Sequence, residues 1–141
     1  MTIVMIEDDS GHARLIEKNL RRAGVTSEIL RFKDGTTALH EMLSDSAKLR
    51  GLVLVLLDLN LPDMAGTDIL IRLKADVRMR CCPVVVLTTT DDKLEVQRCY
   101  DLGACAYVTK PVIYEDFAAA IRQLGLFLSI IQVPDVEPPS A

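Results

Sequence analysis

The 141-residue chain contains no tryptophan and only three tyrosines and three phenylalanines. A protein that stacks nucleic-acid bases needs exposed aromatic side chains, so this composition argues against such a surface. Acidic residues outnumber basic ones by 20 to 16, which gives a formal net charge of −4 and a pI of about 5.1. An acidic surface repels the phosphate backbone, and we therefore expect no nucleic-acid partner.

Long apolar segments are also missing. A membrane helix needs roughly 18 to 20 apolar residues in succession, and the nearest candidate, LGLFLSII at 124–131, is too short. The first residues, MTIVMIEDDS, lack the basic region and the small-residue cleavage site of a signal peptide. We therefore expect a cytoplasmic protein with no membrane segment.

The cysteines lack the spacing of a zinc site. No CxxC motif is present, and both histidines, His12 and His40, lie far from the cysteines in sequence. The interpretation is a set of reduced thiols, buried or half-buried, in a reducing compartment. These thiols are Cys81, Cys82, Cys99 and Cys105.

Short apolar runs alternate with amphipathic segments of helical length. The runs lie at 2–6, 28–32, 52–58, 83–88 and 106–109. The third and fourth runs are apolar at successive positions, which is typical of strands buried on both faces. The predicted helices span 10–23, 35–43, 66–75, 93–102 and 114–132. Five strand–helix pairs predict one α/β domain with a parallel sheet and helices on both faces.

The ends of the predicted helices carry recognisable signals. The expected N-terminal caps are Ser10, Asp34 and either Asp91 or Asp92, and the stop signals are Gly24 and Gly103. We place the domain at 1–132, with an extended last helix. The remaining segment, VPDVEPPSA at 133–141, is Pro-rich and predicts an extended or disordered tail.

Chemically reactive residues follow four of the five runs. The first run ends in Glu7 and Asp8, and the third ends in Asp58. The fourth ends in three threonines at 88–90, and the fifth in Thr109 and Lys110. The second run contributes no obvious chemistry. Because the carboxyl ends of parallel strands meet at one edge of a sheet, we expect these groups to converge.

Such a convergence predicts phosphoryl chemistry. Neighbouring carboxylates disfavour one another's ionisation, and a hard divalent cation such as Mg²⁺ removes that cost. Lys110 then supplies a positive charge and a threonine hydroxyl supplies a hydrogen bond for a phosphoryl group. A carboxylate nucleophile in this setting, which Asp58 is placed to be, is a phosphoryl acceptor.

Four motifs resemble the receiver domain of two-component response regulators, the CheY-like family. They are IEDD at 6–9, LLDLNLPDMAG at 56–66, VVVLTTT at 84–90 and GACAYVTKP at 103–111. The resemblance extends from about residue 2 to about residue 124. It implies a flavodoxin-like fold, a (βα)₅ sheet with strand order 2-1-3-4-5.

The resemblance also implies a role for each site residue. Asp58 is the expected phosphoacceptor. Asp8, Asp58 and the backbone carbonyl of Asn60 are the expected direct ligands of Mg²⁺, or of Mn²⁺ in its place, and Glu7 acts through metal-bound water. Lys110 is the expected phosphate-binding lysine, Thr88 the switch hydroxyl and Tyr107 the aromatic switch. Asp9 is an additional acid that we interpret as a charge at a helix start, and His12 as a surface residue without a role.

The expected function is that of a single-domain response regulator without an output domain of its own. A sensor histidine kinase would donate the phosphoryl group, and phosphorylation would switch a protein-interaction surface. Catalysis would be limited to self-catalysed phosphotransfer and slow autodephosphorylation. Two alternatives stay open: a docking or dimerisation module independent of phosphorylation, and a relay that passes phosphate to a phosphotransfer protein. An aspartate-based phosphatase of the haloacid-dehalogenase type is disfavoured, because Asn60 stands where its second acid would be.

The last predicted helix has more apolar residues than one buried face requires. Those beyond the expected core stripe are Leu126, Phe127, Ile130, Ile131 and Val133. An apolar surface of this extent predicts a homodimer, and folding back onto the same domain is the alternative. The segment also resembles the longer C-termini of receivers that pair with bacterial phytochromes, which makes a bacterial phytochrome an expected kinase.

Overall fold

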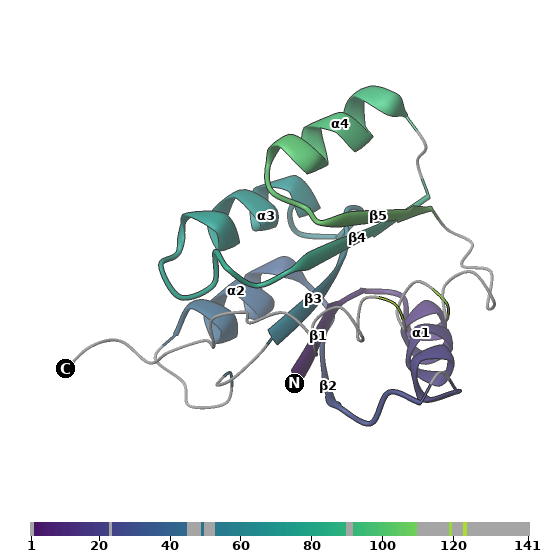
Figure 1. Ribbon diagram of the computed structural model, residues 1–141. Coiled ribbons are helices and arrows are strands. Elements are labelled where there is room, and N and C mark those ends of the chain that lie inside the picture. Colours follow the sequence, from purple (N-terminus) through teal and green to yellow (C-terminus); the bar gives the residue numbers. More distant parts are fainter. Residues whose placement is uncertain are drawn as a thin grey trace.

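The computed structural model describes residues 2–22, 24–44, 49, 53–89, 92–109, 119 and 123 (Figure 1). Its strands are β1 (Thr2–Ile6), β2 (Glu28–Phe32), β3 (Val53–Asp58), β4 (Val84–Thr88) and β5 (Ala106–Thr109). Its helices are α1 (Ser10–Arg22), α2 (Gly35–Leu43), α3 (Gly66–Ala75) and α4 (Lys93–Asp101). Apart from Ala119 and Gln123, the predicted last helix and the tail at 133–141 lie outside the described residues.

The five strands form one parallel sheet in the order β2-β1-β3-β4-β5, which confirms the predicted topology. In the register, Ile6 lies opposite Leu57, and Asp58 lies opposite Leu87. The ends of these neighbouring strands therefore share one edge. The edge strand β2 is only partly buried, because it has a neighbour on one side alone.

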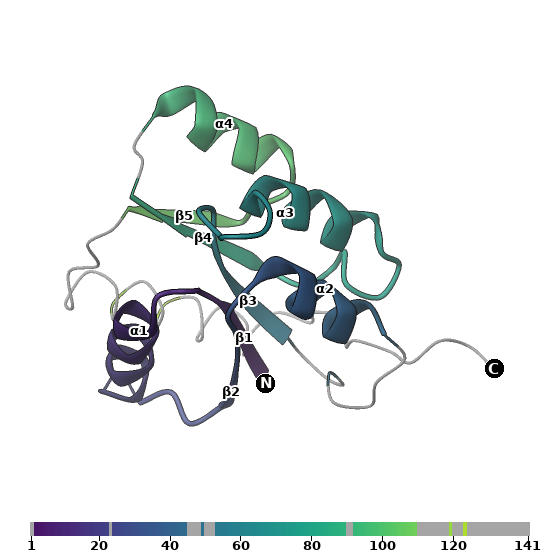
Figure 2. The ribbon, with the colours of Figure 1, turned by 180° about the vertical axis from the view of Figure 1, so that it is seen from behind.

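Helices cover both faces of the sheet, as Figures 1 and 2 show from opposite sides. Val53, Val55 and Leu57 of β3 pack into the core beneath α2, α3 and α4, whereas Leu54 and Leu56 pack into the core beneath α1. Successive side chains of a strand point to opposite faces, which is why the strand is apolar at every position. Within the described part of the chain, no helix combines the length and the apolar character that crossing a bilayer requires.

The helix caps agree with the sequence except at α1. The predicted cap, Ser10, is already the first helical residue, and Asp9 is the cap: the His12 N–H donates to Asp9 Oδ1 at 2.9 Å. An aspartate in this position accepts from the third helical N–H and places a negative charge at the positive end of the helix. The interpretation of Asp9 as a helix-start charge is therefore confirmed. Asp34 and Asp92 cap α2 and α4.

Candidate functional site

Three carboxylates meet at the carboxyl edge of the two central strands. Glu7 and Asp8 follow β1, and Asp58 is the last residue of the adjacent strand β3. Each side chain offers one oxygen, and these oxygens lie within 4.8 Å of one another. Glu7 and Asp58 are buried, and Asp8 is exposed. The predicted convergence of the acids is thus present, with one of its members open to solvent.

The turn after β3 positions Asp58. The Asn60 N–H donates to Asp58 Oδ1 at 3.0 Å, and the Leu59 N–H donates to the Leu87 carbonyl of β4 at 3.3 Å. Asn60 then pairs with Ala65 in an isolated antiparallel bridge, and the Gly66 N–H donates to the Leu59 carbonyl at 3.0 Å. These backbone contacts hold the loop in a tight turn, and α3 begins directly after it.

Thr88 and Tyr107 lie on the same side of the sheet. Thr88 ends β4, is fully buried and has its Oγ1 3.5 Å from Asn60 Nδ2. Tyr107 is half-buried on β5 and packs against the core that includes Val86. Because strand side chains alternate between faces, Thr88 shares the face of Val86. The predicted phosphate-binding residue, Lys110, lies outside the described residues, as does Thr90.

His12 lies closer to the acids than its sequence position suggests. About half of its side chain is exposed, as predicted, but its Nδ1 is 3.1 Å from Glu7 Oε1. The first turn of α1 brings these two side chains together. The interpretation of His12 as a surface residue captured its exposure and missed this contact.

The second strand also contributes to the site. Arg31 of β2 donates from Nε to the Glu7 carbonyl and from Nη2 to the Asp8 carbonyl, both at 3.1 Å. The end of this strand contributes no reactive group to the acids, as expected, but Arg31 within the strand contacts the backbone that carries them. The contact spans more than 20 residues of sequence, and no local pattern around Arg31 indicates it.

A fourth acid anchors the loop that follows Asp58. Asp63 accepts hydrogen bonds from the Gly35 N–H at 2.9 Å, from the Thr36 N–H at 2.7 Å and from the Thr36 hydroxyl. These bonds, led by the one from the Thr36 hydroxyl, lower the pKa of Asp63 to about 2. The loop is thereby tied to the first turn of α2. None of the sequence motifs predicts this role for Asp63.

Comparison with known proteins decides the family. The model of the response regulator receiver domain family matches residues 3–122. The chain belongs to this family.

The receiver is similar to several solved proteins along most of its length. A response regulator receiver domain from Rhodospirillum rubrum is 60% identical, with a TM-score of 0.81 and coverage of 97% of this chain and 99% of that one. The phosphorylated cyanobacterial phytochrome response regulator RcpA is 29% identical, with a TM-score of 0.78 and coverage of 94% and 97%.

A third relative has been solved with a metal. The response regulator Rcp1 of Synechocystis is 29% identical over 94% of this chain and 92% of its own length. Its Mn²⁺-bound form has a TM-score of 0.74 to the receiver. These neighbours establish the CheY-like fold and include response regulators associated with phytochromes.

The cysteines of the receiver are free thiols, as predicted, but the prediction that all four are buried or half-buried is wrong for Cys81 and Cys105. Cys82 and Cys99 are buried, whereas Cys81 and Cys105 are exposed. Burial raises the pKa of the Cys82 thiol to about 11, so this thiol stays protonated at neutral pH. A protonated thiol is neither a good nucleophile nor a good metal ligand.

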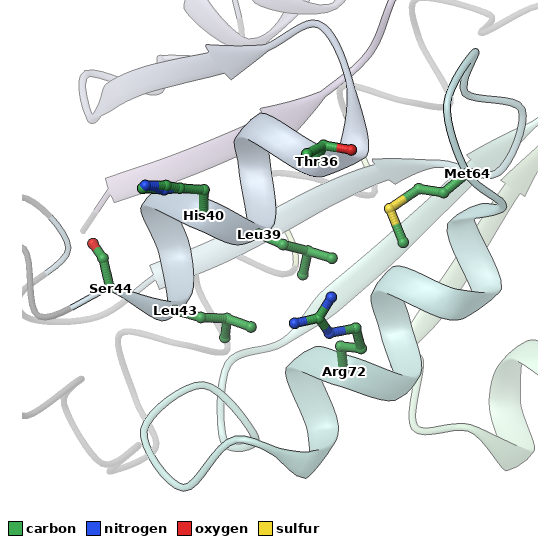
Figure 3. Close-up of a pocket in the computed structure, with 7 residues that line it drawn as sticks. All are labelled: Thr36, Leu39, His40, Leu43, Ser44, Met64 and Arg72. Carbon is green, nitrogen blue, oxygen red and sulfur yellow. The ribbon is translucent and has the colours of Figure 1, made fainter.

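A separate hollow of about 370 Å³ lies between α2 and α3. Figure 3 shows Leu39, Leu43, Met64 and Arg72 pointing toward one another across it. None of the three clustered acids lines this pocket. The hollow and the acidic cluster are therefore separate features of the receiver.

Proposed function

We propose that the receiver accepts a phosphoryl group on Asp58 from the phosphohistidine of a sensor histidine kinase. The observation that carries this proposal is the grouping of Glu7, Asp8 and Asp58 at the end of the sheet, with their oxygens within 4.8 Å of one another. Membership of the receiver family and similarity to the phosphorylated regulator RcpA support it.

The transfer exchanges one bond to phosphorus for another. An Asp58 carboxylate oxygen attacks the phosphorus atom, and the P–N bond of the phosphohistidine breaks. The electron pair of that bond returns to the imidazole nitrogen, which takes up a proton. The product is an acyl phosphate on Asp58, which water hydrolyses slowly; the receiver carries out no other catalysis in this proposal.

The donor set fits a hard divalent cation. Carboxylates and backbone carbonyls are the ligands that Mg²⁺ and Mn²⁺ prefer, and three carboxylates as close as these repel one another without a cation. Asp8, Asp58 and the Asn60 carbonyl would hold the ion, and Glu7 would act through a bound water. The ion would neutralise negative charge on the carboxylates and on the phosphoryl oxygens. The Mn²⁺-bound form of Rcp1 supports this assignment.

The switch would start from Thr88. We assign its hydroxyl to the phosphoryl group on Asp58, and Tyr107 to the movement that follows on the same face of the sheet. Phosphorylation would then shift the population between two packings of the surface around α4 and β5. Lys110, which follows β5, is assigned to a phosphoryl oxygen on sequence grounds alone.

Labelling with acetyl phosphate in the presence of Mg²⁺ tests the proposal without a known kinase. Intact-mass spectrometry should show one phosphoryl group on the wild type and none on the D58N variant. D68N is the matched control, because it makes the same change at an exposed aspartate in the first turn of α3 and should retain labelling. Undiminished labelling of D58N would reject Asp58 as the acceptor.

The pathway is proposed from the relatives. Similarity to RcpA and Rcp1 supports a bacterial phytochrome as the kinase, and the output is a contact with another protein, with phosphate transfer to a phosphotransfer protein as the second candidate. A docking module that needs no phosphate is less well supported, because Glu7, Asp8 and Asp58 are all present and close together. The cytoplasmic location and the absence of a nucleic-acid partner stay predictions from composition.

A further inference from the structure

Arg31 continues the contact between β1 and β2 beyond the point where the strands end. The last backbone bond between them joins the Glu7 N–H to the Phe32 carbonyl at 3.0 Å. Beyond it, the guanidinium of Arg31 donates to two successive carbonyls, those of Glu7 and Asp8, at 3.1 Å each. One side chain therefore holds both peptide units that carry the acids from β1.

The acidic segment 7–9 is fixed on its other side by α1. The Ala13 N–H donates to the Asp9 carbonyl at 2.9 Å, and the His12 N–H donates to the Asp9 side chain at the same distance. Arg31 and α1 thus hold the segment from opposite ends. Without Arg31, the Glu7 and Asp8 carbonyls would each lose a side-chain donor from β2, while the backbone bond from the Glu7 N–H to the Phe32 carbonyl would remain.

We propose that Arg31 is a positioning residue for the divalent-cation site, an inference that rests on the proposed function. By fixing the backbone at Glu7 and Asp8, it holds their carboxylates in place beside Asp58. It also places one positive charge beside the backbone carbonyls of Glu7 and Asp8. Groups that orient metal ligands in this way typically contribute about 10- to 100-fold to metal affinity.

Geometry and charge make separable contributions. A guanidinium is a rigid planar fork that can donate two bonds in fixed directions, whereas an ammonium is a point charge on a flexible stem. The R31K variant keeps the positive charge but lacks the planar guanidinium. The R31M variant keeps an apolar stem of similar length and lacks both the charge and the guanidinium. If positioning matters, R31K must bind the metal more weakly than the wild type does.

Isothermal titration calorimetry of the purified full chain with Mn²⁺ tests the inference. We expect R31M to bind Mn²⁺ at least about tenfold more weakly than the wild type, and R31K to lie between the two. R72M is the matched control: none of the residues that the structure describes forms a hydrogen bond or ion pair with Arg72, and it lines the hollow between α2 and α3. It should bind Mn²⁺ as the wild type does. Thermal unfolding without metal establishes that each variant is folded.

The outcomes separate this inference from the proposed function. If the wild type does not bind Mn²⁺, the proposed cation site itself is wrong. If the wild type binds and R31M binds equally well, Arg31 has no positioning role and the proposed function stands. If R31K binds as tightly as the wild type, Arg31 acts by charge alone and positioning is rejected. Should R31M fail to fold, R31K decides in the same way.

Discussion

At the scale of single residues, Asp63 shows how one carboxylate can complete a helix terminus from a distance. The first N–H groups of a helix have no partner inside the helix. In α2, Asp34 accepts from the Thr37 N–H, and Asp63 accepts from the two before it, on Gly35 and Thr36. Asp63 belongs to the loop that follows Asp58. Its ionised side chain therefore stabilises both the start of α2 and the loop of the acceptor site.

This arrangement predicts how the stability depends on pH. The pKa of Asp63 is lowered from 3.8 to about 2 in the folded protein. A group with a depressed pKa stabilises the fold at pH values above its unfolded pKa, and that contribution is lost as the pH falls from about 4 toward 2. D63N should lower the free energy of unfolding at pH 7 and lose less stability than the wild type over that acid range. Urea unfolding at a series of pH values measures both effects.

The exposed Asp68 provides the control for this experiment. It lies in the first turn of α3, and its side chain accepts no bond from the start of α2. The free energy of unfolding of D68N should fall between pH 4 and pH 2 as that of the wild type does. If D63N and the wild type lose stability in parallel between pH 4 and pH 2, the contacts of Asp63 do not contribute as described.

The site residues that sequence patterns predict and those that they do not predict differ in the kind of contact they make. Asp58 and Asp8 were identified because each ends an apolar run, and parallel strands bring such ends together. Arg31 and Asp63 act on backbone groups more than 20 residues away. Nothing near them in sequence marks those partners, since the contacts depend on how strands and loops pack. The α1 cap is Asp9 and not Ser10 for a local reason. Both residue types can cap a helix, and which of them does so depends on where the chain leaves β1 and the helix begins.

At the scale of elements, α3 packs directly against the loop that carries Asp58. Gly66 opens this helix, and a Cβ atom placed there would lie 2.6 Å from Leu59 Cα and 2.7 Å from the Asp58 carbonyl oxygen. Both neighbours are backbone atoms and cannot turn away as a side chain can. The absence of a side chain at Gly66 therefore allows α3 to begin immediately beside the acceptor residue.

We expect G66A to destabilise the receiver by about 1–3 kcal/mol, the usual cost of inserting a methyl group into a filled space. Because the displaced backbone belongs to Asp58 and Leu59, the same variant should also label more slowly with acetyl phosphate. Urea unfolding and intact-mass spectrometry measure the two effects. Wild-type values in both measurements would show that the Asp58 loop moves aside at little cost and that Gly66 is not required there.

Gly11 provides the same substitution in a different setting. It lies in the first turn of α1, and a Cβ atom there would approach only Asp9 Oδ1, at 3.2 Å. G11A should therefore lose less stability than G66A, because a carboxylate side chain can shift where backbone cannot, and alanine favours a helix more than glycine does. A similar loss in G11A and G66A would mean that the cost comes from removing glycine and not from crowding at Asp58.

The elements themselves were predictable because their signals are local. Apolar residues at every position predicted that β3 and β4 are covered on both faces, and the two cores confirm it. The positive φ angles of Gly24 and Gly103, 89° and 107°, explain why these residues end their helices. The close approach of α3 to the Asp58 loop could not be predicted in this way. Gly66 indicates where a helix begins, but the sequence does not indicate which residues pack against it.

At the scale of the whole molecule, phosphate on Asp58 would change the relative populations of two conformations that present different surfaces. A phosphoryl group can shift such an equilibrium only by the difference in its interaction with the two states. If the same surface takes part in self-association, phosphorylation and oligomeric state become coupled, and each changes the other by the same factor. The mass of the particle in solution then reports on the switch.

The apolar residues near the end of the sequence predict where two copies meet. We expect the wild type to have the mass of a dimer in light scattering, and the double variant F127E/I131E to be a monomer, because buried glutamates without partners are costly at an apolar interface. Val77 is an exposed apolar residue after α3, and V77E, which introduces the same side chain there, should leave the dimer intact. Repeating the measurement with beryllofluoride and Mg²⁺ shows whether activation changes the balance. If the F127E/I131E variant is still a dimer, the interface lies elsewhere. If the wild type is a monomer with and without beryllofluoride, the homodimer is excluded. Neither result affects the role of Asp58 as phosphoacceptor, which the labelling experiment tests separately.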